Sequence, residues 1–223
     1  MKFKAIIFDL DGTIIDTNHI WDQATHHLIT SKGIDLTHED KHHLSVKLKG
    51  IAIPHSCAFL KEKYNLPHTL EELMVEKKAH ADRLYKEGVL FVEGFENFHK
   101  RAIEHNLALG IATNAENYTL KTAIELLDLR KYFNKHIYNF EDANNIPKPA
   151  PDVYLYAAKQ LGIDPKHCLV IEDSCHGIEA ANKAGMFCIG INTGKNREAL
   201  KEAKHIVEHY DEIDLPSLLG IKK

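Results

Sequence analysis

Hydrophobic residues near the start of the chain form one short, continuous run. The run covers residues 5–8, and two carboxylates, Asp9 and Asp11, follow it. A strand that is covered on both faces of a parallel sheet reads as such a run, so the pattern predicts a buried strand. Open α/β sheets carry their chemistry beyond the carboxyl ends of strands. Side-chain direction repeats every second residue in an extended chain, so we expect Asp9 and Asp11 to point together into a site.

The pattern over residues 17–88 is helical and contains no convincing strand. Thr69 with Glu72 forms a capping box that opens a helix running to about Lys86, and Thr37 with Asp40 is a weaker start of the same kind. Two further helices are expected at 17–32 and 56–64. The segment therefore predicts a helical domain over residues 16–89, inserted into a core formed by residues 1–15 and 90–223.

Strand and helix patterns alternate over the rest of the chain. Apolar runs predict strands at 107–112, 135–138, 167–171, 187–191 and 206–207. Helical spacing predicts helices at 95–105, 117–127, 152–161, 177–184, 197–203 and 215–219. Such alternation is typical of a doubly wound parallel sheet with right-handed crossovers, so the predicted fold class is α/β.

The composition of the chain argues against nucleic acid and membranes as binding partners. The 223 residues are 44% hydrophobic and 27% charged, as in ordinary globular proteins, and a net charge of −4 gives no electrostatic reason to bind nucleic acid. No apolar run reaches the roughly 20 residues that span a bilayer, and no signal-peptide pattern opens the chain. The four cysteines contain no CxxC pair, which fits a reducing compartment. We expect a cytoplasmic protein that binds neither nucleic acid nor membrane, as a monomer or weak homodimer.

Polar groups also follow the later strands. Thr113 and Asn114 end the second predicted strand, where a hydroxyl, an amide and backbone N–H groups can hold anionic oxygens. Lys148 precedes the stiff segment Pro149-Ala150-Pro151, which favours a helix start and aims a point charge at one place. Each feature alone also fits a turn opening or a solvated lysine.

Glu172 and Asp173 end another apolar strand, as Asp9 and Asp11 end the first. Carboxylates that meet at one edge of a sheet repel each other unless a cation or a proton intervenes. A hard cation such as Mg²⁺ prefers oxygen ligands. Two acidic strand ends therefore indicate a metal site more strongly than either does alone.

Four stretches match a known family in order: Asp9-Leu-Asp-Gly-Thr13, Thr113-Asn114, the segment from Lys148 to Asp152, and Glu172-Asp173-Ser174 with its small-residue helix. Over nearly its whole length the chain resembles the haloacid dehalogenase superfamily. It is most similar to the subgroup with an inserted cap, which includes phosphoglycolate phosphatase-like enzymes and β-phosphoglucomutase. The resemblance implies a Rossmann-like core with an α-helical cap domain.

The resemblance also implies a mechanism. Asp9 would be the nucleophile that forms an aspartyl-phosphate, and Asp11 would be the general acid and base. Mg²⁺ would be held by Asp9, the backbone carbonyl of Asp11 and Asp173, with Glu172 as a direct ligand or close by. The dehalogenases of the superfamily lack the second aspartate, so Asp11 indicates phosphoryl transfer.

The phosphoryl oxygens would be held by Thr113, Asn114 and Lys148, according to the same resemblance. Such positioned donors are usually the largest electrostatic contribution to catalysis. Relatives often have glycine just before the lysine, where this chain has Pro147. Proline fixes φ and removes an N–H, but it leaves Lys148 available.

The cap region bears on the substrate. Leu48-Lys49-Gly50 resembles a β-phosphoglucomutase segment that faces the sugar, but Ala52-Ile53 replaces its Ser-Arg pair. Loss of the arginine removes the clamp for a second phosphate. We therefore expect hydrolysis of a small phosphomonoester, of the phosphoglycolate or sugar phosphate type. Thr17, Lys49 and Gly50 are the expected substrate-side residues, whereas Trp21 is interpreted as packing.

Two other functions stay open at this point. A β-phosphoglucomutase-like phosphomutase would discharge its phosphorylated intermediate to a sugar faster than to water. A catalytically silent binding protein is possible because fold does not imply function. That alternative predicts a broken motif, whereas Asp9, Asp11, Lys148 and Asp173 are all present.

Overall fold

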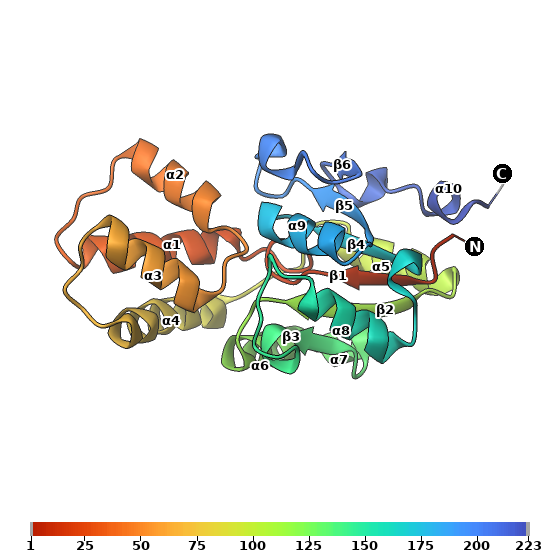
Figure 1. Ribbon diagram of the computed structural model, residues 1–223, viewed down its shortest axis with the longest axis horizontal. Coiled ribbons are helices and arrows are strands. Elements are labelled where there is room, and N and C mark those ends of the chain that lie inside the picture. The colour runs from red at the N-terminus through yellow and green to blue at the C-terminus, as the bar shows by residue number, and fades with distance from the viewer. Residues whose placement is uncertain (1, 222–223) are drawn as a thin grey trace.

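A single six-stranded parallel sheet forms the centre of the computed structural model, which describes residues 2–221 (Figure 1). The strands are β1 Ala5–Phe8, β2 Ala108–Thr113, β3 Ile137–Asn139, β4 Cys168–Glu172, β5 Phe187–Ile191 and β6 His205–Val207. Their order, β3-β2-β1-β4-β5-β6, confirms the doubly wound sheet. The order reverses between β1 and β4, and such a switch point opens a crevice at the carboxyl ends of the strands.

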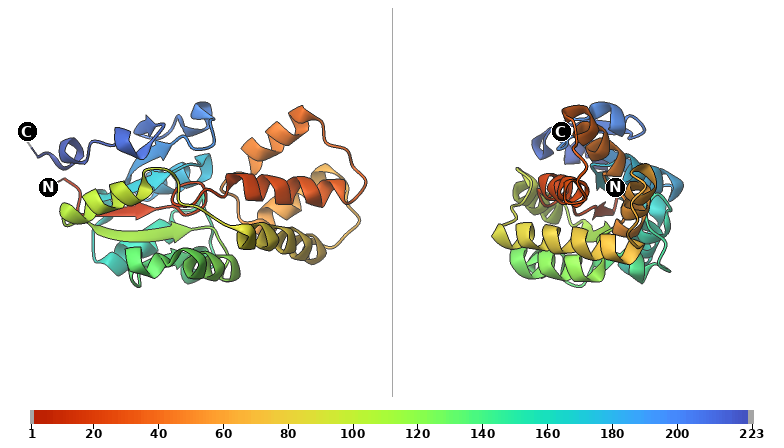
Figure 2. Two further views of the ribbon diagram at one scale, coloured as in Figure 1. Left: turned by 180° about the vertical axis from the view of Figure 1, so that it is seen from behind. Right: turned by 90° about the vertical axis from the view of Figure 1, so that its left-hand side faces the viewer.

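Helices cover both faces of this sheet (Figures 1 and 2). They are α5 Phe95–Glu104, α6 Asn117–Leu127, α7 Leu129–Phe133, α8 Asp152–Leu161, α9 Cys175–Lys183 and α10 Leu215–Leu219. Ile6 and Phe8 of β1 pack into one apolar cluster with residues of α5, α6, α7 and α10. Ala5 and Ile7 pack into a second cluster with α8 and α9. The alternating side chains of β1 thus anchor both layers, which fixes the position of the residues that follow it.

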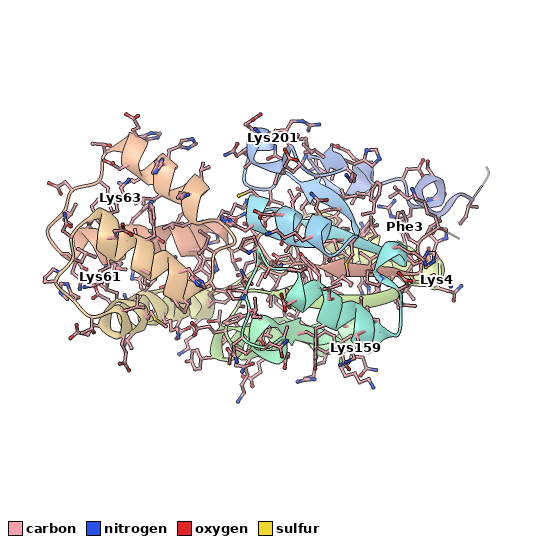
Figure 3. The ribbon with its side chains drawn as sticks, viewed as in Figure 1. Phe3, Lys4, Lys61, Lys63, Lys159 and Lys201 are labelled. Atoms are coloured by element: carbon pink, nitrogen blue, oxygen red, sulfur yellow. The ribbon has the colours of Figure 1, made fainter. Side chains whose placement is uncertain are left out.

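Charged side chains lie on the outside of these layers. Lys159 on α8 and Lys201 are exposed, whereas Phe3 is buried with its ring centroid 5.3 Å from that of Phe187 (Figure 3). Single 3₁₀ turns occur at η1 Phe140–Asp142, η2 Pro165–His167, η3 Arg197–Leu200 and η4 Tyr210–Glu212. Within residues 2–221, no helix combines the length and apolar character needed to cross a bilayer.

Four further helices lie beyond the carboxyl ends of the strands, apart from the sheet (Figure 1). They are α1 Asn18–Thr30, α2 His38–Leu48, α3 Ile53–Lys63 and α4 Leu70–Glu87. Their inward side chains form a separate apolar core that includes Leu28, Leu44, Leu60 and Leu73. We call these helices the cap and propose residues 16–89 as its extent.

The two chain segments that lead into and out of the cap are bonded to each other. The amide of Asp16 donates to the carbonyl of Leu90 at 2.9 Å, and the amide of Val92 donates to that of Ile14 at 2.8 Å. Ile15 also forms an antiparallel bridge with Phe91. The cap is therefore attached through one paired ribbon.

Local sequence chemistry accounts for the starts of three of the cap helices. The capping boxes at Thr37 and Thr69 are both present. The third helix begins at Ile53, three residues before the predicted start, because Pro54 fits the first turn, where its missing N–H costs nothing. Helix α7 was not predicted, and the helix predicted at 197–203 is the shorter turn η3.

Candidate active site

The acids that end β1 and β4 meet at the switch point. Phe8 pairs with Ile171 across the two strands, and the amide of Asp9 donates to the carbonyl of Ile171 at 3.0 Å. This register places Asp9 beside Glu172 and Asp173. Carboxylate oxygens of these three buried residues all lie within 4.8 Å of one another. The expected convergence of acids from two strands is present.

Lys148 is the cation inside this cluster. Its buried ammonium donates to Oδ1 of Asp9 at 2.6 Å and to Oε1 of Glu172 at 2.8 Å. It also lies 4.6 Å from the ring centroid of Tyr154, a cation–π distance. The lysine therefore links the two acidic strand ends, and its position is fixed from three sides.

Glu172 uses both of its oxygens within the protein. Oε1 accepts from Lys148 and, at 3.0 Å, from the hydroxyl of Tyr154. Oε2 accepts from the amides of Asp173 and Ser174 and from the hydroxyl of Ser174, each at 2.9 Å. A Cβ at Gly177 would lie 1.5 Å from Oε1, so only glycine leaves room for this carboxylate. Glu172 thus supports the loop and Lys148.

Electrostatics distinguishes the three acids. Burial raises the pKa of Asp9 well above its usual value, and the charge of Lys148 opposes this only in part. Burial also raises the pKa of Asp173, against the opposing charge of Lys49. For Glu172, burial is outweighed by the charge of Lys148 and several hydrogen bonds, so its pKa is lowered. Asp9 and Asp173 each contact a lysine, but for these two acids burial outweighs the charge of that lysine.

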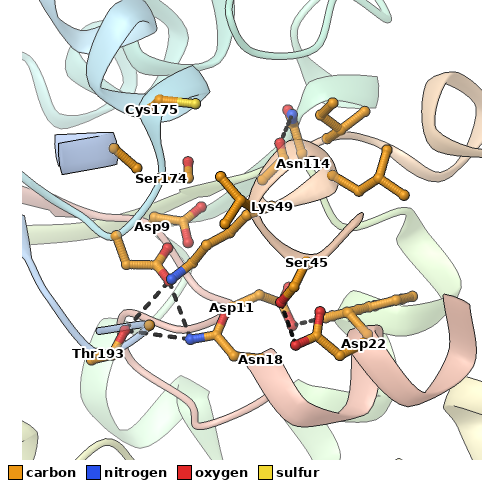
Figure 4. Close-up of a pocket in the computed structure, with 18 of the residues that line it drawn as sticks. Asp9, Asp11, Asn18, Asp22, Ser45, Lys49, Asn114, Ser174, Cys175 and Thr193 are labelled. Carbon is orange, nitrogen blue, oxygen red and sulfur yellow. Dashed lines mark hydrogen bonds and ion pairs between the residues drawn. The ribbon is translucent and has the colours of Figure 1, made fainter. Parts of the chain in front are cut away.

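Asp173 is approached from the cap and from the loop after β5. Lys49 lies 2.7 Å from Oδ2 of Asp173, and Asn18 and Thr193 each contact the same oxygen at 3.4 Å (Figure 4). A Cβ at Gly12 would lie 2.1 Å from this oxygen, and the φ of Gly12 is +81°. Glycine is required there by both space and backbone conformation.

Asp11 is not a member of the acid cluster. Its Oδ1 accepts from the Thr17 hydroxyl at 2.7 Å, from the Trp21 indole at 2.9 Å and from the Tyr85 hydroxyl. We expected the side chains of Asp9 and Asp11 to point together into a site. Both residues line the same cavity, but the carboxylate of Asp11 does not join that of Asp9 in the acid cluster. Burial, followed by the charge of Asp11, raises the pKa of Tyr85 well above its usual value, so its hydroxyl remains a donor.

Thr113 and Asn114 lie at the end of β2 beside the acids. The hydroxyl of Thr113 accepts from the amide of Ala115 at 3.0 Å. The amide group of Asn114 donates to the carbonyls of Gly50 at 2.9 Å and Lys148 at 3.2 Å, and it accepts from the Lys148 amide at 2.9 Å. Asn114 therefore connects the lysine loop to the cap.

A cavity of about 580 Å³ separates the core from the cap (Figure 4). Most of the residues predicted for the site line it, namely Asp9, Asp11, Lys49, Gly50, Thr113, Asn114 and Asp173. Lys148, Glu172 and Thr17 are not among the lining residues but are bonded to those that are. The structure thus brings all the predicted site residues to one place.

Comparison with known proteins agrees with this geometry. A family model described as "Haloacid dehalogenase-like hydrolase" matches residues 6–191, which include β2 to β5, all of β1 but its first residue and all of the acids above. The chain belongs to this family. The haloacid dehalogenase-like chain is an enzyme of the phosphatase type, as the sequence predicts.

Named relatives extend over most of both chains. The haloacid dehalogenase-like chain is 32% identical over 190 residues to "Probable pseudouridine-5'-phosphatase" of Drosophila melanogaster, covering 83% of this chain and 80% of that one. It is 29% identical to "Hexitol phosphatase B" of Escherichia coli K12, with 84% and 83% covered. The crystal structure of β-phosphoglucomutase from Clostridium difficile superposes with a TM-score of 0.82 at 27% identity, with 98% and 96% covered.

The donor set fits a divalent ion, as is usual in haloacid dehalogenase-like phosphatases. Asp9 and Asp173 are buried, burial raises their pKa values, and a carboxylate oxygen of each lies within 4.8 Å of the other and of Glu172. Hard cations take such ligands. The buried acid cluster is therefore consistent with a metal site.

Several residues of the site were missed from the sequence. Trp21 was interpreted as packing and does pack against Tyr85, but it also donates to Asp11. Tyr85, Lys77 and Thr193 lie far from the recognised motifs along the chain, and no local pattern marks them. Tyr85 looks like an ordinary apolar position of α4, so only the folded arrangement shows its contact.

Proposed function

We propose that this haloacid dehalogenase-like phosphatase hydrolyses small phosphomonoesters of the sugar phosphate type, with Mg²⁺, through a phosphorylated Asp9. The observation that supports this most strongly is the placement of Asp9. Asp9 directly follows β1, its carboxylate accepts from Lys148 and lies within 4.8 Å of that of Asp173, and it lines a cavity that is large enough for a small metabolite.

The first step is transfer of the phosphoryl group to the protein. An oxygen of Asp9 forms a bond to phosphorus while the bond from phosphorus to the leaving oxygen breaks. Asp11 gives its proton to that oxygen, which leaves as an alcohol. Dividing the reaction in this way replaces one difficult step by two easier ones.

The second step is hydrolysis of the aspartyl-phosphate. Asp11, now ionised, takes a proton from water as the water oxygen attacks phosphorus. The bond from phosphorus to Asp9 breaks, which releases phosphate and restores both carboxyl groups. General acid–base catalysis of this kind contributes roughly 10²–10⁴-fold.

The other residues hold charge in place. Mg²⁺, when held by Asp9, Asp173 and the backbone carbonyl of Asp11, would supply positive charge that keeps the acids ionised and offsets that of the phosphate. Thr113, Asn114 and Lys148 would hold phosphoryl oxygens. We propose that Glu172 acts by fixing Lys148 and the loop, because both of its oxygens already accept hydrogen bonds.

The cap end of the cavity offers groups for a polyhydroxy leaving group. Asp22, Ser45 and Lys77 all line it, and the hydroxyl of Ser45 donates to Asp22. Lys77 is buried and donates to the hydroxyl of Ser56 at 2.9 Å. A carboxylate acceptor and an ammonium donor are suited to sugar or polyol hydroxyls. The names of two relatives, a hexitol phosphatase and a probable pseudouridine-5'-phosphatase, agree with such a substrate.

Replacing Lys77 by methionine is expected to separate substrate binding from folding. Burial lowers the pKa of Lys77 from 10.5 to about 8, so the folded chain loses a proton that the unfolded chain keeps between these values. Stability of the parent therefore rises with pH over this window. Lys77→Met should lack that rise, melt at a higher temperature at pH 7 and raise KM for a sugar phosphate by about tenfold or more.

A lysine on the same helix provides the control for this measurement. Lys86→Met removes an exposed charge from α4 and should change neither the KM nor the pH dependence of melting. If Lys77→Met keeps the parental KM for every substrate that the parent hydrolyses, Lys77 has no part in recognition.

A substrate panel tests the proposed function directly. Phosphate release is measured from hexose phosphates, hexitol phosphates, nucleoside monophosphates and phosphoglycolate, with and without Mg²⁺. We expect turnover that depends on Mg²⁺ and is greatest with polyhydroxy esters. A lack of Mg²⁺-dependent phosphate release across the panel would contradict the proposal and would favour a silent binding protein.

A phosphomutase is the second candidate, because a β-phosphoglucomutase superposes over nearly the whole chain. The absent Ser-Arg pair, replaced by Ala52 and Ile53, argues against it. The two are separated by incubation with β-glucose 1-phosphate and a bisphosphate primer. Hydrolysis predicts free phosphate and glucose, whereas a mutase predicts glucose 6-phosphate without loss of ester.

A further inference from the structure

One oxygen of Asp11 is the meeting point of three side-chain donors. Thr17 and Trp21 approach Oδ1 from the start of the cap, and Tyr85 approaches it from the last turn of α4. The rings of Trp21 and Tyr85 pack edge to face with their centroids 6.1 Å apart. The donors therefore support one another as well as the carboxyl group.

The three bonds make the two oxygens of Asp11 unequal. An indole N–H can only donate, so Oδ1 must be an acceptor. Thr17 and Tyr85 donate to the same atom. Within residues 2–221, no side-chain hydrogen bond ends on Oδ2 of Asp11, so Oδ2 is the oxygen that can carry and exchange a proton.

We propose that Trp21 and Tyr85 are positioning residues that hold Oδ1 of Asp11, so that Oδ2 transfers the proton to the leaving group and later accepts one from water. The inference rests on the proposed function, because it takes Asp11 as the proton carrier. Without these two donors only the hydroxyl of Thr17 still donates to Oδ1, so the carboxyl group is held less firmly and Oδ2 is less often in position.

The leaving group determines how strongly the rate of phosphoryl transfer depends on the position of Asp11. An alkoxide is a poor leaving group and needs the proton of Asp11 as the bond to phosphorus breaks. The 4-nitrophenolate ion is stable without that proton. Loss of positioning must therefore slow phosphoryl transfer from an alkyl ester more than from 4-nitrophenyl phosphate, whereas loss of packing slows both alike.

The experiment compares Trp21→Phe and Tyr85→Phe with the parent and with Asp11→Asn. Phenylalanine keeps an aromatic ring at each site. At Tyr85 it removes only the hydroxyl, whereas at Trp21 it also replaces the indole by a smaller ring, so the comparison of the two esters is needed to separate loss of the donor from loss of packing. Rapid-quench measurements in Mg²⁺ follow a single turnover of 4-nitrophenyl phosphate and of the best alkyl ester from the substrate panel. Tyr132→Phe is the matched control, because it removes a hydroxyl that donates to the exposed Glu96, away from the cavity.

We expect each variant to slow phosphoryl transfer from the alkyl ester by about tenfold or more, within the range that acid catalysis contributes. Transfer from 4-nitrophenyl phosphate should change less than about threefold, and KM from a separate steady-state assay should change little. Asp11→Asn should show the same selectivity with a larger loss, and Tyr132→Phe should match the parent with both esters.

Two results would overturn the inference. Equal losses with both esters, or no loss with either, in Trp21→Phe and Tyr85→Phe would leave these residues a packing role only. If Asp11→Asn is itself selective, that failure concerns the positioning residues alone. If Asp11→Asn shows no selectivity, Asp11 is not the proton carrier, and the inference fails together with that part of the proposed function.

Discussion

An Asp9→Asn variant is expected to lose at least about 10⁴-fold in kcat, which is the scale seen when a covalent nucleophile is removed. Asparagine has the same shape, but its amide cannot form the acyl-phosphate. The measurement is steady-state phosphate release, with acid-quenched samples assayed for protein-bound phosphate. We expect no bound phosphate in the variant and a transient amount in the parent.

The same Asp9→Asn change should increase the stability of the fold while it abolishes activity. The pKa of Asp9 in the folded chain is raised well above 3.8, chiefly by burial, so the folded form binds more protons than the unfolded form as pH rises above that value. The parent without metal is therefore destabilised toward neutral pH, and Asp9→Asn is relieved of this cost. The variant should melt at a higher temperature than the metal-free parent at pH 7, with the gap closing toward pH 4.

Asp35→Asn is the matched control for both measurements, because it makes the same chemical change at an exposed position outside the cavity. It should leave kcat and melting unchanged within error. Substantial turnover by a folded Asp9→Asn protein, with bound phosphate still formed, would assign the nucleophile to another residue.

Lys148→Met is expected to cost about 3–5 kcal/mol of stability, the usual result of removing one partner from a buried ion pair. Lys148 is 3% exposed and contacts both Asp9 and Glu172, so the variant keeps two buried acids without their cation. In a chain of this size the loss corresponds to a fall of roughly 10 °C in Tm. Activity should fall by about 10²-fold or more, because a charge that faces the transferring phosphate is removed.

Acid should partly rescue the folding of this variant. Without Lys148, protonation is what neutralises Asp9 and Glu172, so the gap in Tm between variant and parent should narrow as pH falls from 7 toward 5. Lys121→Met provides the comparison, because Lys121 pairs with Glu125 on the exposed face of α6 and should cost less than about 0.5 kcal/mol. Equal Tm values for Lys148→Met and the parent at pH 7 would show that Lys148 does not stabilise the acid pair.

Most of the sheet could be predicted because the signals are local. The runs of β2, β4 and β5 stop at a polar pair and that of β1 stops at Asp9, and the capping boxes of α2 and α4 lie within four residues. The element α7 was missed because it is a five-residue helix that follows directly on α6 at Asp128, whose φ is +47°. Five residues are too few to show the spacing of apolar residues that identifies a helix.

The sequence indicated which residues form the site better than it indicated how those residues contact one another. Matching four motifs placed Asp9, Lys148 and Asp173 at one site, but it did not show that Lys148 donates to Asp9 across 139 residues of sequence. Thr17 shows that contacts between residues close in sequence were also hard to predict. Its hydroxyl could have capped α1, yet it donates to Asp11, and α1 begins without a side-chain cap.

The paired ribbon between core and cap restricts how the cavity can open. Two unbonded linkers would let the cap rotate in several directions. Here the two linkers are hydrogen-bonded to each other, between Asp16 and Leu90 and between Ile14 and Val92, so they can bend only together. We therefore expect the cap to open as a flap, with both segments moving together. Ile15 of this ribbon also bridges to Asp11, which couples the second acid to such a movement, whereas the amide of Asp9 is bonded to Ile171 of β4 in the core.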